Sequence, residues 1–360
     1  MIGEQVTRSG SRWWSTMAGG NRMQALVYTG THRLEVQDVP VPTPGPTEML
    51  VRVHYAGICG SDLHGFEGRS TNRRPPLVMG HEFAGTVLAT GEDVEGFAEG
   101  EYVTVNPLLS CGRCIPCRAG RANVCTRRKL IGIDYPGGFA ELVVAPVDNV
   151  FALPLGMPLR LGALAEPLAN AVHVASLGPR NKFGACFVVG AGAIGLLCLQ
   201  VARLAGASPL IISDRNPHRL RVARDLGADV TIDVTQDDPV ERVRAETRSG
   251  AAWTIDAVGT PATRQQAVSA LANSGTAVFI GLEKGTGEID LREAILRELS
   301  LHGSYAYTPD EFATAIELLA RGRINPAGWL SSGALADGQA LFAELATAST
   351  PRVKVMFDLV

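Results

Sequence analysis

The sequence contains no apolar run long enough to cross a membrane, no large excess of one charge and no apolar block near its N-terminus. A spanning helix needs roughly 18–20 apolar residues, and no uninterrupted stretch of the 360 residues reaches that length. The formal net charge is −3 and no long run of one sign occurs, which argues against nucleic acid as the main partner. The N-terminus lacks the apolar block of a signal peptide. These absences predict a protein with no membrane and no nucleic acid as its partner.

Disulfide bonds are also not expected. The chain has seven cysteines, an odd number, and without a secretory signal a reducing compartment is favoured. We therefore expect a cytoplasmic protein.

The length and a change of texture near residue 181 predict two domains. Residues 24–180 hold short β-branched runs separated by glycine and proline, which predicts an irregular, mostly β domain. After residue 181, apolar strands alternate with helical segments. That alternation predicts an α/β domain with a doubly wound parallel sheet.

The predicted boundaries divide the chain into four segments. Residues 23–178 form the β-rich domain, 179–308 the sheet domain, and 309–360 a return to the first domain. Residues 1–22 are expected to be a disordered extension or an over-long start; an ordered arm through Trp13 and Trp14 is the alternative.

A glycine-rich turn marks a dinucleotide site in the sheet domain. "VVGAGAIG" places Gly190, Gly192 and Gly195 in the G-x-G-x-x-G pattern, after a strand and at the start of a helix. Such glycines permit a tight turn and close approach of the backbone to a pyrophosphate at the helix N-terminus. A turn that binds nothing is the alternative, but the complete strand–turn–helix–strand–acid context favours binding.

The acid in that context is Asp214, which ends the second strand nineteen residues after Gly195. A carboxylate there accepts hydrogen bonds from the ribose hydroxyls and repels a 2′-phosphate, so NAD is favoured over NADP. Arg215 follows at once and weakens that exclusion. The predicted cofactor-binding residues are Gly190, Gly192, Ala193, Ile194, Gly195, Asp214, Arg215 and Arg219.

Four cysteines lie within "CGRCIPCRAGRANVC" in the β-rich domain: Cys111, Cys114, Cys117 and Cys125. The bacterial iron–sulfur run begins similarly but closes with C-x3-C-P, whereas seven residues separate the last two cysteines here. Four thiolates complete a tetrahedral zinc shell and leave no open position for substrate. The spacing therefore predicts a structural zinc ion.

A second, sparser set of metal donors is spread over the same domain: Cys59, His81, Glu82 and Glu166. Three protein ligands with a fourth position open to water or substrate are what catalytic zinc requires. Asp62 is a candidate acceptor for the far nitrogen of His81. Each residue taken alone also fits an ordinary core or helix-start position.

The motifs "AGICGSDLH", "GHEFAGTV", the four-cysteine loop, "EPLANAVH" and "VVGAGAIG" occur in this order within residues 23–360. Together they resemble the zinc-dependent medium-chain dehydrogenases, and specifically the polyol branch with sorbitol, threonine and butanediol dehydrogenases. The resemblance implies a GroES-like catalytic domain carrying both zinc sites and a Rossmann domain for NAD. It also implies a homodimer or homotetramer joined through the nucleotide domains.

The resemblance assigns the catalytic zinc to Cys59, His81 and a glutamate, and leaves open whether Glu82 or Glu166 binds directly. It implies reversible oxidation of a secondary alcohol to a ketone, by hydride transfer to NAD from an alkoxide held by zinc. Ser61 and His64 match the family's proton relay; an exposed loop histidine is the alternative for His64.

The substrate is less clearly indicated. Ala306 stands where sorbitol dehydrogenases carry a sugar-binding arginine, which argues against sorbitol. Arg69, Arg73 and Arg74 suggest either an anionic or highly hydroxylated substrate or a solvated loop. A polyol, sugar alcohol, cyclitol or sugar phosphate is the expected substrate. The alternatives are an amino alcohol, as in L-threonine 3-dehydrogenases, and a non-enzymatic relative that binds zinc and NAD.

Overall fold

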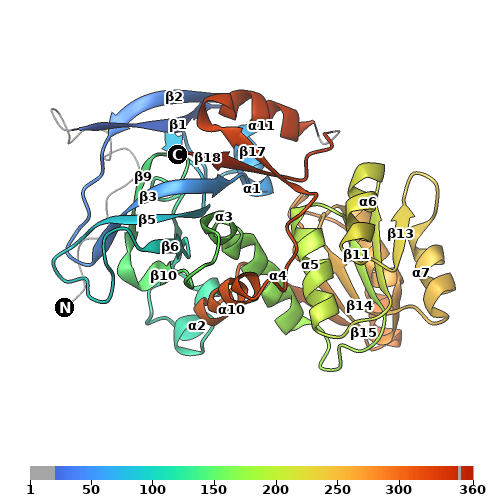
Figure 1. Cartoon of the computed structure of the whole chain (residues 1–360). Coiled ribbons are helices and arrows are strands. Elements are labelled where there is room, and N and C mark those ends of the chain that lie inside the picture. The colour runs from blue at the N-terminus through green and yellow to red at the C-terminus, as the bar shows by residue number, and fades with distance from the viewer. Residues whose placement is uncertain (1–20, 348–349, 360) are drawn as a thin grey trace. The chain divides into compact units, whose positions relative to one another are not determined.

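A computed structural model of the chain describes residues 21–347 and 350–359. The predicted extension at 1–22 therefore lies almost entirely outside the described residues, and the first strand begins at Arg22. The chain divides into two compact units (Figure 1). The first comprises the described residues of Met1–Glu166, Ser331–Thr350 and Val355–Val360; the second comprises Pro167–Leu330 and Pro351–Lys354.

The first unit is built mainly of β-strands. Its largest sheet has the order β10-β6-β5-β3-β18-β17, with β9 also paired to β3, and a smaller sheet has the order β2-β1-β4. The strands are β1 (Arg22–Gly30), β2 (Arg33–Pro40), β3 (Glu48–Gly57), β4 (Leu77–Val78), β5 (Glu82–Thr90), β6 (Tyr102–Val105), β7 (Leu108–Leu109), β8 (Lys129–Leu130), β9 (Leu142–Pro146), β10 (Val150–Ala152), β17 (Leu330–Ala334) and β18 (Lys354–Asp358).

Short helices complete this unit: α1 (Gly60–Phe66), α2 (Ile115–Arg118), α3 (Leu159–Gly162) and α11 (Gly338–Ala346), with 3-10 turns at Ala122–Val124, Val147–Asn149 and Leu335–Asp337. The two chain segments that return after residue 330 supply β17, α11 and β18. The backbone of Phe357 in β18 pairs with that of Ala56 in β3, so the C-terminal strand lies between β3 and β17 in the large sheet.

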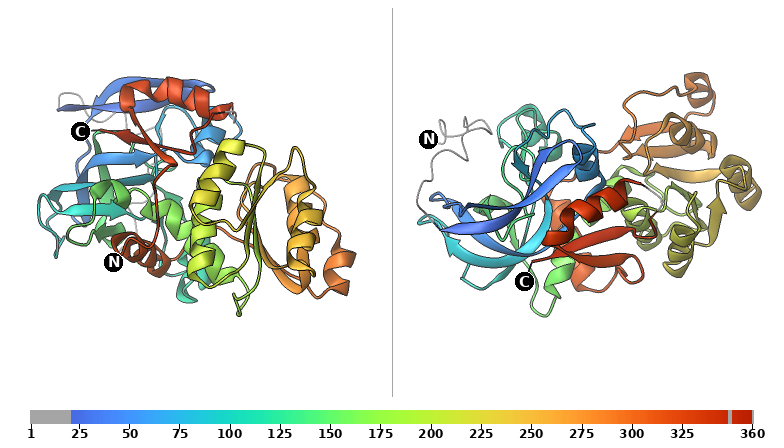
Figure 2. Two further views of the ribbon diagram at one scale, coloured as in Figure 1. Left: turned by 45° about the vertical axis from the view of Figure 1, so that its right-hand side comes forward. Right: turned by 90° about the horizontal axis from the view of Figure 1, so that it is seen from above.

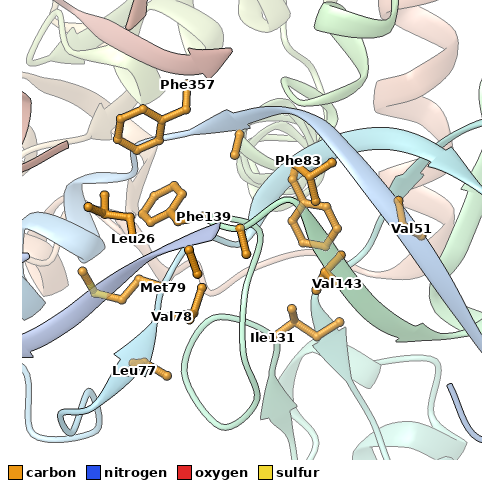
Figure 3. Close-up of a cluster of buried hydrophobic side chains, with 14 of the residues drawn as sticks. Leu26, Val51, Leu77, Val78, Met79, Phe83, Ile131, Phe139, Val143 and Phe357 are labelled. Atoms are coloured by element: carbon orange, nitrogen blue, oxygen red, sulfur yellow. The ribbon is translucent and has the colours of Figure 1, made fainter. Parts of the chain in front are cut away.

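A dense apolar core lies beneath the strands that lead to the candidate metal residues (Figure 3). Phe139 packs edge-on against Phe357 with ring centroids 5.1 Å apart. Met79 and Phe83 are 0% and 1% exposed. Full burial of such side chains stabilises a fold by roughly 1.5–3 kcal/mol each. Because these two anchors flank residues 80–82, they fix the backbone that carries His81.

The second unit is a six-stranded parallel sheet in the order β13-β12-β11-β14-β15-β16. Figure 2 shows helices on both of its faces in the left view. The strands are β11 (Cys186–Val189), β12 (Leu210–Asp214), β13 (Val230–Asp233), β14 (Ala251–Asp256), β15 (Leu271–Phe279) and β16 (Ser300–Gly303); the helices are α4 (Ala165–Leu177), α5 (Ala193–Leu204), α6 (Pro217–Asp225), α7 (Pro239–Thr247), α8 (Pro261–Ser269), α9 (Leu291–Leu296) and α10 (Pro309–Ala320).

The predicted fold class is confirmed. All four residues of β11 are buried, as expected of a central strand covered on both faces. The strand order is that of a Rossmann sheet, 3-2-1-4-5-6, with ligands expected at the carboxyl ends of the strands.

The division between units differs from the predicted boundaries at 178/179 and 308/309. It falls after Glu166, inside α4, and at Leu330. The part of α4 after Glu166 and the whole of α10 therefore belong to the second unit. A polar contact joins these two helices, since His173 of α4 lies 2.9 Å from a carboxylate oxygen of Glu311 in α10.

No helix among the described residues is both long and apolar enough to pass through a bilayer.

Candidate active site

Three of the four sparse metal donors meet in the first unit. The donor atoms of Cys59, His81 and Glu82 all lie within 4.8 Å of one another. Cys59 is the N-cap of α1, while His81 and Glu82 lead into β5. His81 and Glu82 are 5% and 1% exposed. The set combines a thiolate, an imidazole and a carboxylate, which are donors suited to zinc.

The backbone before His81 is held by the segment 137–139. Gly137 N–H donates to the carbonyl of Val78 at 2.8 Å, and Phe139 N–H donates to that of Met79 at 3.0 Å. Gly80 has φ +94°, and a Cβ at this position would lie 2.5 Å from the Phe139 ring. Glycine is therefore required at residue 80 both by its conformation and by the close ring.

Asp62 connects two of the donors. One of its oxygens, Oδ2, accepts the N–H of Cys59 at 3.2 Å, and the other, Oδ1, lies 3.4 Å from His81 Nδ1. The two atoms do not form a hydrogen bond in the described structure. The contact nevertheless turns Nδ1 toward the carboxylate and leaves Nε2 as the nitrogen for a metal, as the sequence suggested.

The charges in this cluster stabilise one another. Burial alone would raise the pKa of Asp62, but His81 and, after it, Arg73 outweigh this effect and hold the pKa at about 2. Burial alone would lower the pKa of His81, whereas the nearby Asp62 and Cys59 raise it well above its usual value. A proton therefore competes with a metal for the His81 ring.

Arg73 is a member of this cluster that sequence reasoning did not place there. Arg69 and Arg74 are exposed, as a solvated loop predicts, but Arg73 is 7% exposed and faces inward. Its Nη2 donates to Ser61 Oγ at 2.9 Å and to Asp62 Oδ1 at 3.1 Å. The expectation that Arg73 belongs to a solvated loop is wrong, because its guanidinium is buried and hydrogen-bonded inside the protein.

Three further residues were expected at this site: Ser61, His64 and Glu166. Ser61 Oγ lies 3.3 Å from Cys59 Sγ as a hydrogen-bond donor. His64 is half-buried in the last turn of α1. Glu166 is 9% exposed in the first turn of α4, but its carboxylate does not belong to the group of atoms within 4.8 Å. The structure thus groups Glu82, and not Glu166, with Cys59 and His81.

The four-cysteine loop also converges. Cys111, Cys114, Cys117 and Cys125 offer sulfurs within 4.8 Å of one another. The sulfur of Cys114 lies 3.4 Å from that of Cys117 and 3.8 Å from that of Cys125. Tetrahedral zinc with Zn–S bonds of about 2.3 Å places its sulfurs about 3.8 Å apart. The donor set and its spacing therefore fit a closed zinc shell.

Hydrogen bonds from backbone amides lower the pKa values of two of these thiols. Hydrogen bonding by the Arg113 amide lowers the pKa of Cys111 to about 5, and bonding by the Cys117 amide lowers the pKa of Cys114 to about 7. The guanidinium of Arg127 lies 3.5 Å from the Cys111 sulfur. Such thiolates bind metal without much competition from protons at neutral pH.

The three glycines of the dinucleotide turn have three different surroundings. Gly190 has φ +96°, which permits the tight turn. A Cβ on Gly195 would lie 1.8 Å from the Gly190 carbonyl oxygen, so this glycine allows the helix to approach the strand. A Cβ on Gly192 would have no atom within 4 Å. The open space at Gly192, the N-cap of α5, fits the approach of a pyrophosphate.

The Asp214 carboxylate fixes the backbone around this turn by accepting hydrogen bonds from two N–H groups. Its Oδ2 accepts the N–H of Ala191 at 2.7 Å and its Oδ1 accepts the N–H of Asn216 at 2.8 Å. Each carboxylate oxygen has a second lone pair, so ribose hydroxyls can still bind. Arg215 is exposed, and the Nε of the half-buried Arg219 has no hydrogen-bond partner in the described structure. Ala193 and Ile194 open α5.

Comparisons with known proteins agree with this architecture. Residues 45–155 match the family model "Alcohol dehydrogenase GroES-like domain", and residues 193–321 match "Zinc-binding dehydrogenase". An L-threonine 3-dehydrogenase of Symbiobacterium thermophilum is 39% identical over 74% of this chain and 78% of that protein.

Two solved structures are also similar. An alcohol dehydrogenase of Escherichia coli CFT073, complexed with NADH, has a TM-score of 0.88 and 30% identity, and the match covers 94% of this chain and 100% of that one. Galactitol-1-phosphate dehydrogenase of Escherichia coli has a TM-score of 0.86 and 28% identity over the same shares. The chain therefore belongs to the zinc-dependent medium-chain dehydrogenases, and it is an NAD-dependent oxidoreductase with zinc as its metal cofactor.

Proposed function

We propose that the chain oxidises a secondary alcohol to a ketone, reversibly, at the Cys59–His81–Glu82 site, with NAD as hydride acceptor and L-threonine as the first substrate to test. The observation that carries the reaction class is the convergence of these three donors within 4.8 Å. Three protein donors leave a fourth position for substrate, whereas the four-cysteine loop leaves none.

Zinc, when bound, supplies Lewis acidity that makes the alcohol proton easier to lose. The chain's own residues hold the donors and receive that proton. Asp62 orients His81, and the burial of His81 and Glu82 keeps bulk water away. Glu166 remains a candidate ligand, either directly or through water.

The proposed proton path runs through Ser61 and His64. Both residues lie on α1, whose N-cap is Cys59, and an imidazole can both accept and donate a proton. Ser61 donates to the Cys59 sulfur in this structure. Its hydroxyl would therefore have to rotate away from the sulfur before it could pass a proton from the substrate to His64.

The amino-alcohol reading of the substrate has stronger support than the polyol reading. The relative from Symbiobacterium, named L-threonine 3-dehydrogenase, is 39% identical, whereas galactitol-1-phosphate dehydrogenase is 28% identical. The latter name keeps polyols and sugar phosphates as the second candidate class.

A substrate panel tests this choice. NADH formation is followed with L-threonine, other amino alcohols, polyols, cyclitols and sugar phosphates, in the wild type and in Glu166→Ala. Activity confined to L-threonine supports the proposal, and activity confined to polyols would replace it. Full activity of Glu166→Ala would remove Glu166 from the site.

We further propose a preference for NAD over NADP. The Asp214 carboxylate, braced by two amides, would repel a 2′-phosphate. The ratio of kcat/KM for the two cofactors measures this preference.

A homo-oligomer joined through the second unit is proposed as well. β16 ends the described sheet, and α9, which precedes it, exposes Leu291, Ile295 and Leu296 by 63–74%. An edge strand beside exposed apolar side chains is a typical contact between copies. Ile295→Asp should lower the mass measured by light scattering, whereas Leu155→Asp, at a residue exposed in the first unit, should not.

Free thiols and zinc thiolates favour the cytoplasm as the compartment.

A further inference from the structure

A buried arginine lies behind the candidate catalytic donors. Among residues 67–76, all of which the structure describes, Arg73 alone is buried, and its side chain is 4% exposed. Its loop is otherwise exposed, so the side chain turns inward from the surface. Burial of a cation is costly unless the charge is paired and hydrogen-bonded. The contacts of Arg73 should therefore explain why it is there.

The protein makes room for this side chain. Gly65 lies in α1, and a Cβ at this position would be 2.4 Å from Arg73 Cδ. The sulfur of Met79 would be the next nearest atom, at 3.3 Å. A larger residue at position 65 would force the Arg73 side chain to shift. The glycine in α1 and the arginine in the following loop thus form a matched pair.

The first contact of Arg73 determines which way the Ser61 hydroxyl points. A guanidinium can only donate hydrogen bonds, so Ser61 Oγ is the acceptor in the 2.9 Å contact with Arg73 Nη2. The single proton of Ser61 is then directed to the Cys59 sulfur, 3.3 Å away. Arg73 therefore acts on the first metal donor, Cys59, through one intervening hydroxyl.

The second contact reaches the other donor. Arg73 Nη2 lies 3.1 Å from Asp62 Oδ1, which is the oxygen that faces His81 Nδ1 at 3.4 Å. The other oxygen of Asp62 accepts the Cys59 N–H. Without Arg73 the fully buried Asp62 would lose a cationic partner and a hydrogen bond that fixes its rotation.

We propose that Arg73 is a positioning residue for the catalytic zinc, which holds the Ser61 hydroxyl on the Cys59 sulfur and the Asp62 carboxylate against His81. The inference rests on the proposed ligand set and adds to it a residue that does not itself touch the metal. Loss of such outer contacts typically costs about 10- to 100-fold in metal affinity or activity.

The test compares Arg73→Met with Arg74→Met in the zinc-loaded protein. Methionine keeps the bulk of the side chain but removes every donor, and Arg74 is the exposed neighbour. Zinc release to a chromogenic chelator is recorded, and Cys59→Ser identifies which release phase belongs to the catalytic ion. We expect that phase to show about 10- to 100-fold weaker binding in Arg73→Met, no change in Arg74→Met, and partial recovery in Arg73→Lys, which restores a donor.

A spectroscopic readout follows the Ser61 contact separately. In cobalt-substituted protein, Arg73→Met should move the cobalt–thiolate charge-transfer band to lower energy, because a sulfur with a looser hydrogen bond gives up an electron more readily. In a Ser61→Ala background the same substitution should leave the band unchanged.

Three outcomes decide the matter. Zinc release from Arg73→Met that matches Arg74→Met would overturn the inference, even if Arg73→Met unfolds at a lower temperature. If Arg73→Met does not fold, Ser61→Ala decides: wild-type zinc release and a wild-type cobalt band in that variant would overturn the inference, because no hydroxyl then links Arg73 to Cys59. A Cys59→Ser protein that keeps both zinc ions would instead overturn the proposed ligand set.

Discussion

The two candidate metal sites of the first unit use opposite means to hold an ion. The closed site takes four sulfurs from one short loop, and its cysteines Cys111, Cys114 and Cys117 are partly exposed. The open site collects a sulfur, a ring nitrogen and a carboxylate from two separate elements, with His81 and Glu82 buried. The donors of the first come from one local loop, while those of the second are brought together by elements that pack on the core of the first unit. A protein that prearranges three donors and leaves a position open can use the metal for chemistry.

The largest expected effect comes from the open site. Cys59→Ser should reduce kcat/KM by at least about 10²-fold, because the transition state loses electrostatic stabilisation by the metal. Steady-state NADH formation measures it. Cys186→Ser, at a buried cysteine on β11 outside both metal sites, is the control. Wild-type activity in Cys59→Ser would show that the chemistry does not depend on this donor.

A chelator should remove the zinc ions of the two sites at different rates. An open coordination position admits a chelator more readily than four thiolates do. We expect activity and one zinc ion to be lost first with the unfolding temperature almost unchanged. The second ion should leave later, with a fall of more than about 5 °C, which corresponds to roughly 2 kcal/mol. Simultaneous loss of both ions would erase the distinction between the sites.

A smaller effect is expected in the second unit, where Asp214 holds the dinucleotide turn. Asp214→Ser should lower kcat/KM for NAD by about 10- to 100-fold, as the loss of charged hydrogen bonds predicts, and should raise the relative use of NADP. Cofactor titrations at fixed substrate give both constants. An unchanged NAD-to-NADP ratio would mean that the carboxylate does not select the cofactor.

The smallest effect concerns stability in acid and also belongs to the second unit. Burial alone would raise the pKa of Glu311, but hydrogen bonds from His173 and the Thr308 amide hold it at about 2, below the ordinary 4.5. This carboxylate therefore contributes stability above pH 4.5 that is lost as the pH falls toward about 2. Urea unfolding of Glu311→Gln and the wild type across that window measures the contribution. The contribution would be contradicted if the free energy of unfolding changed with pH by the same amount in both proteins.

Much of this organisation could be predicted from sequence because it is encoded locally. The four-cysteine spacing, the G-x-G-x-x-G turn and the strand–helix alternation each lie within a short segment, and the structure forms each of them. Cys59 and His81 were predicted from family motifs, since residues twenty-two positions apart carry no periodicity that would join them.

What the sequence did not reveal depends on contacts between segments. Arg73 reads as one of several loop arginines until the cavity left by Gly65 and the partners on α1 are known. Its burial is a property of tertiary packing, which composition and spacing do not contain. The separation of Glu166 from the grouped donors has the same origin, because α4 begins far along the chain from β5.

The most direct test of the account is a metal count on matched variants. Zinc per chain and NAD-dependent activity are measured for the wild type, Cys59→Ser and Cys114→Ser. The account predicts two zinc ions in the wild type, one zinc ion and no activity in Cys59→Ser, and one zinc ion with activity retained in the folded fraction of Cys114→Ser. It would be contradicted if Cys59→Ser kept two zinc ions, or if Cys114→Ser remained as stable as the wild type yet lost activity.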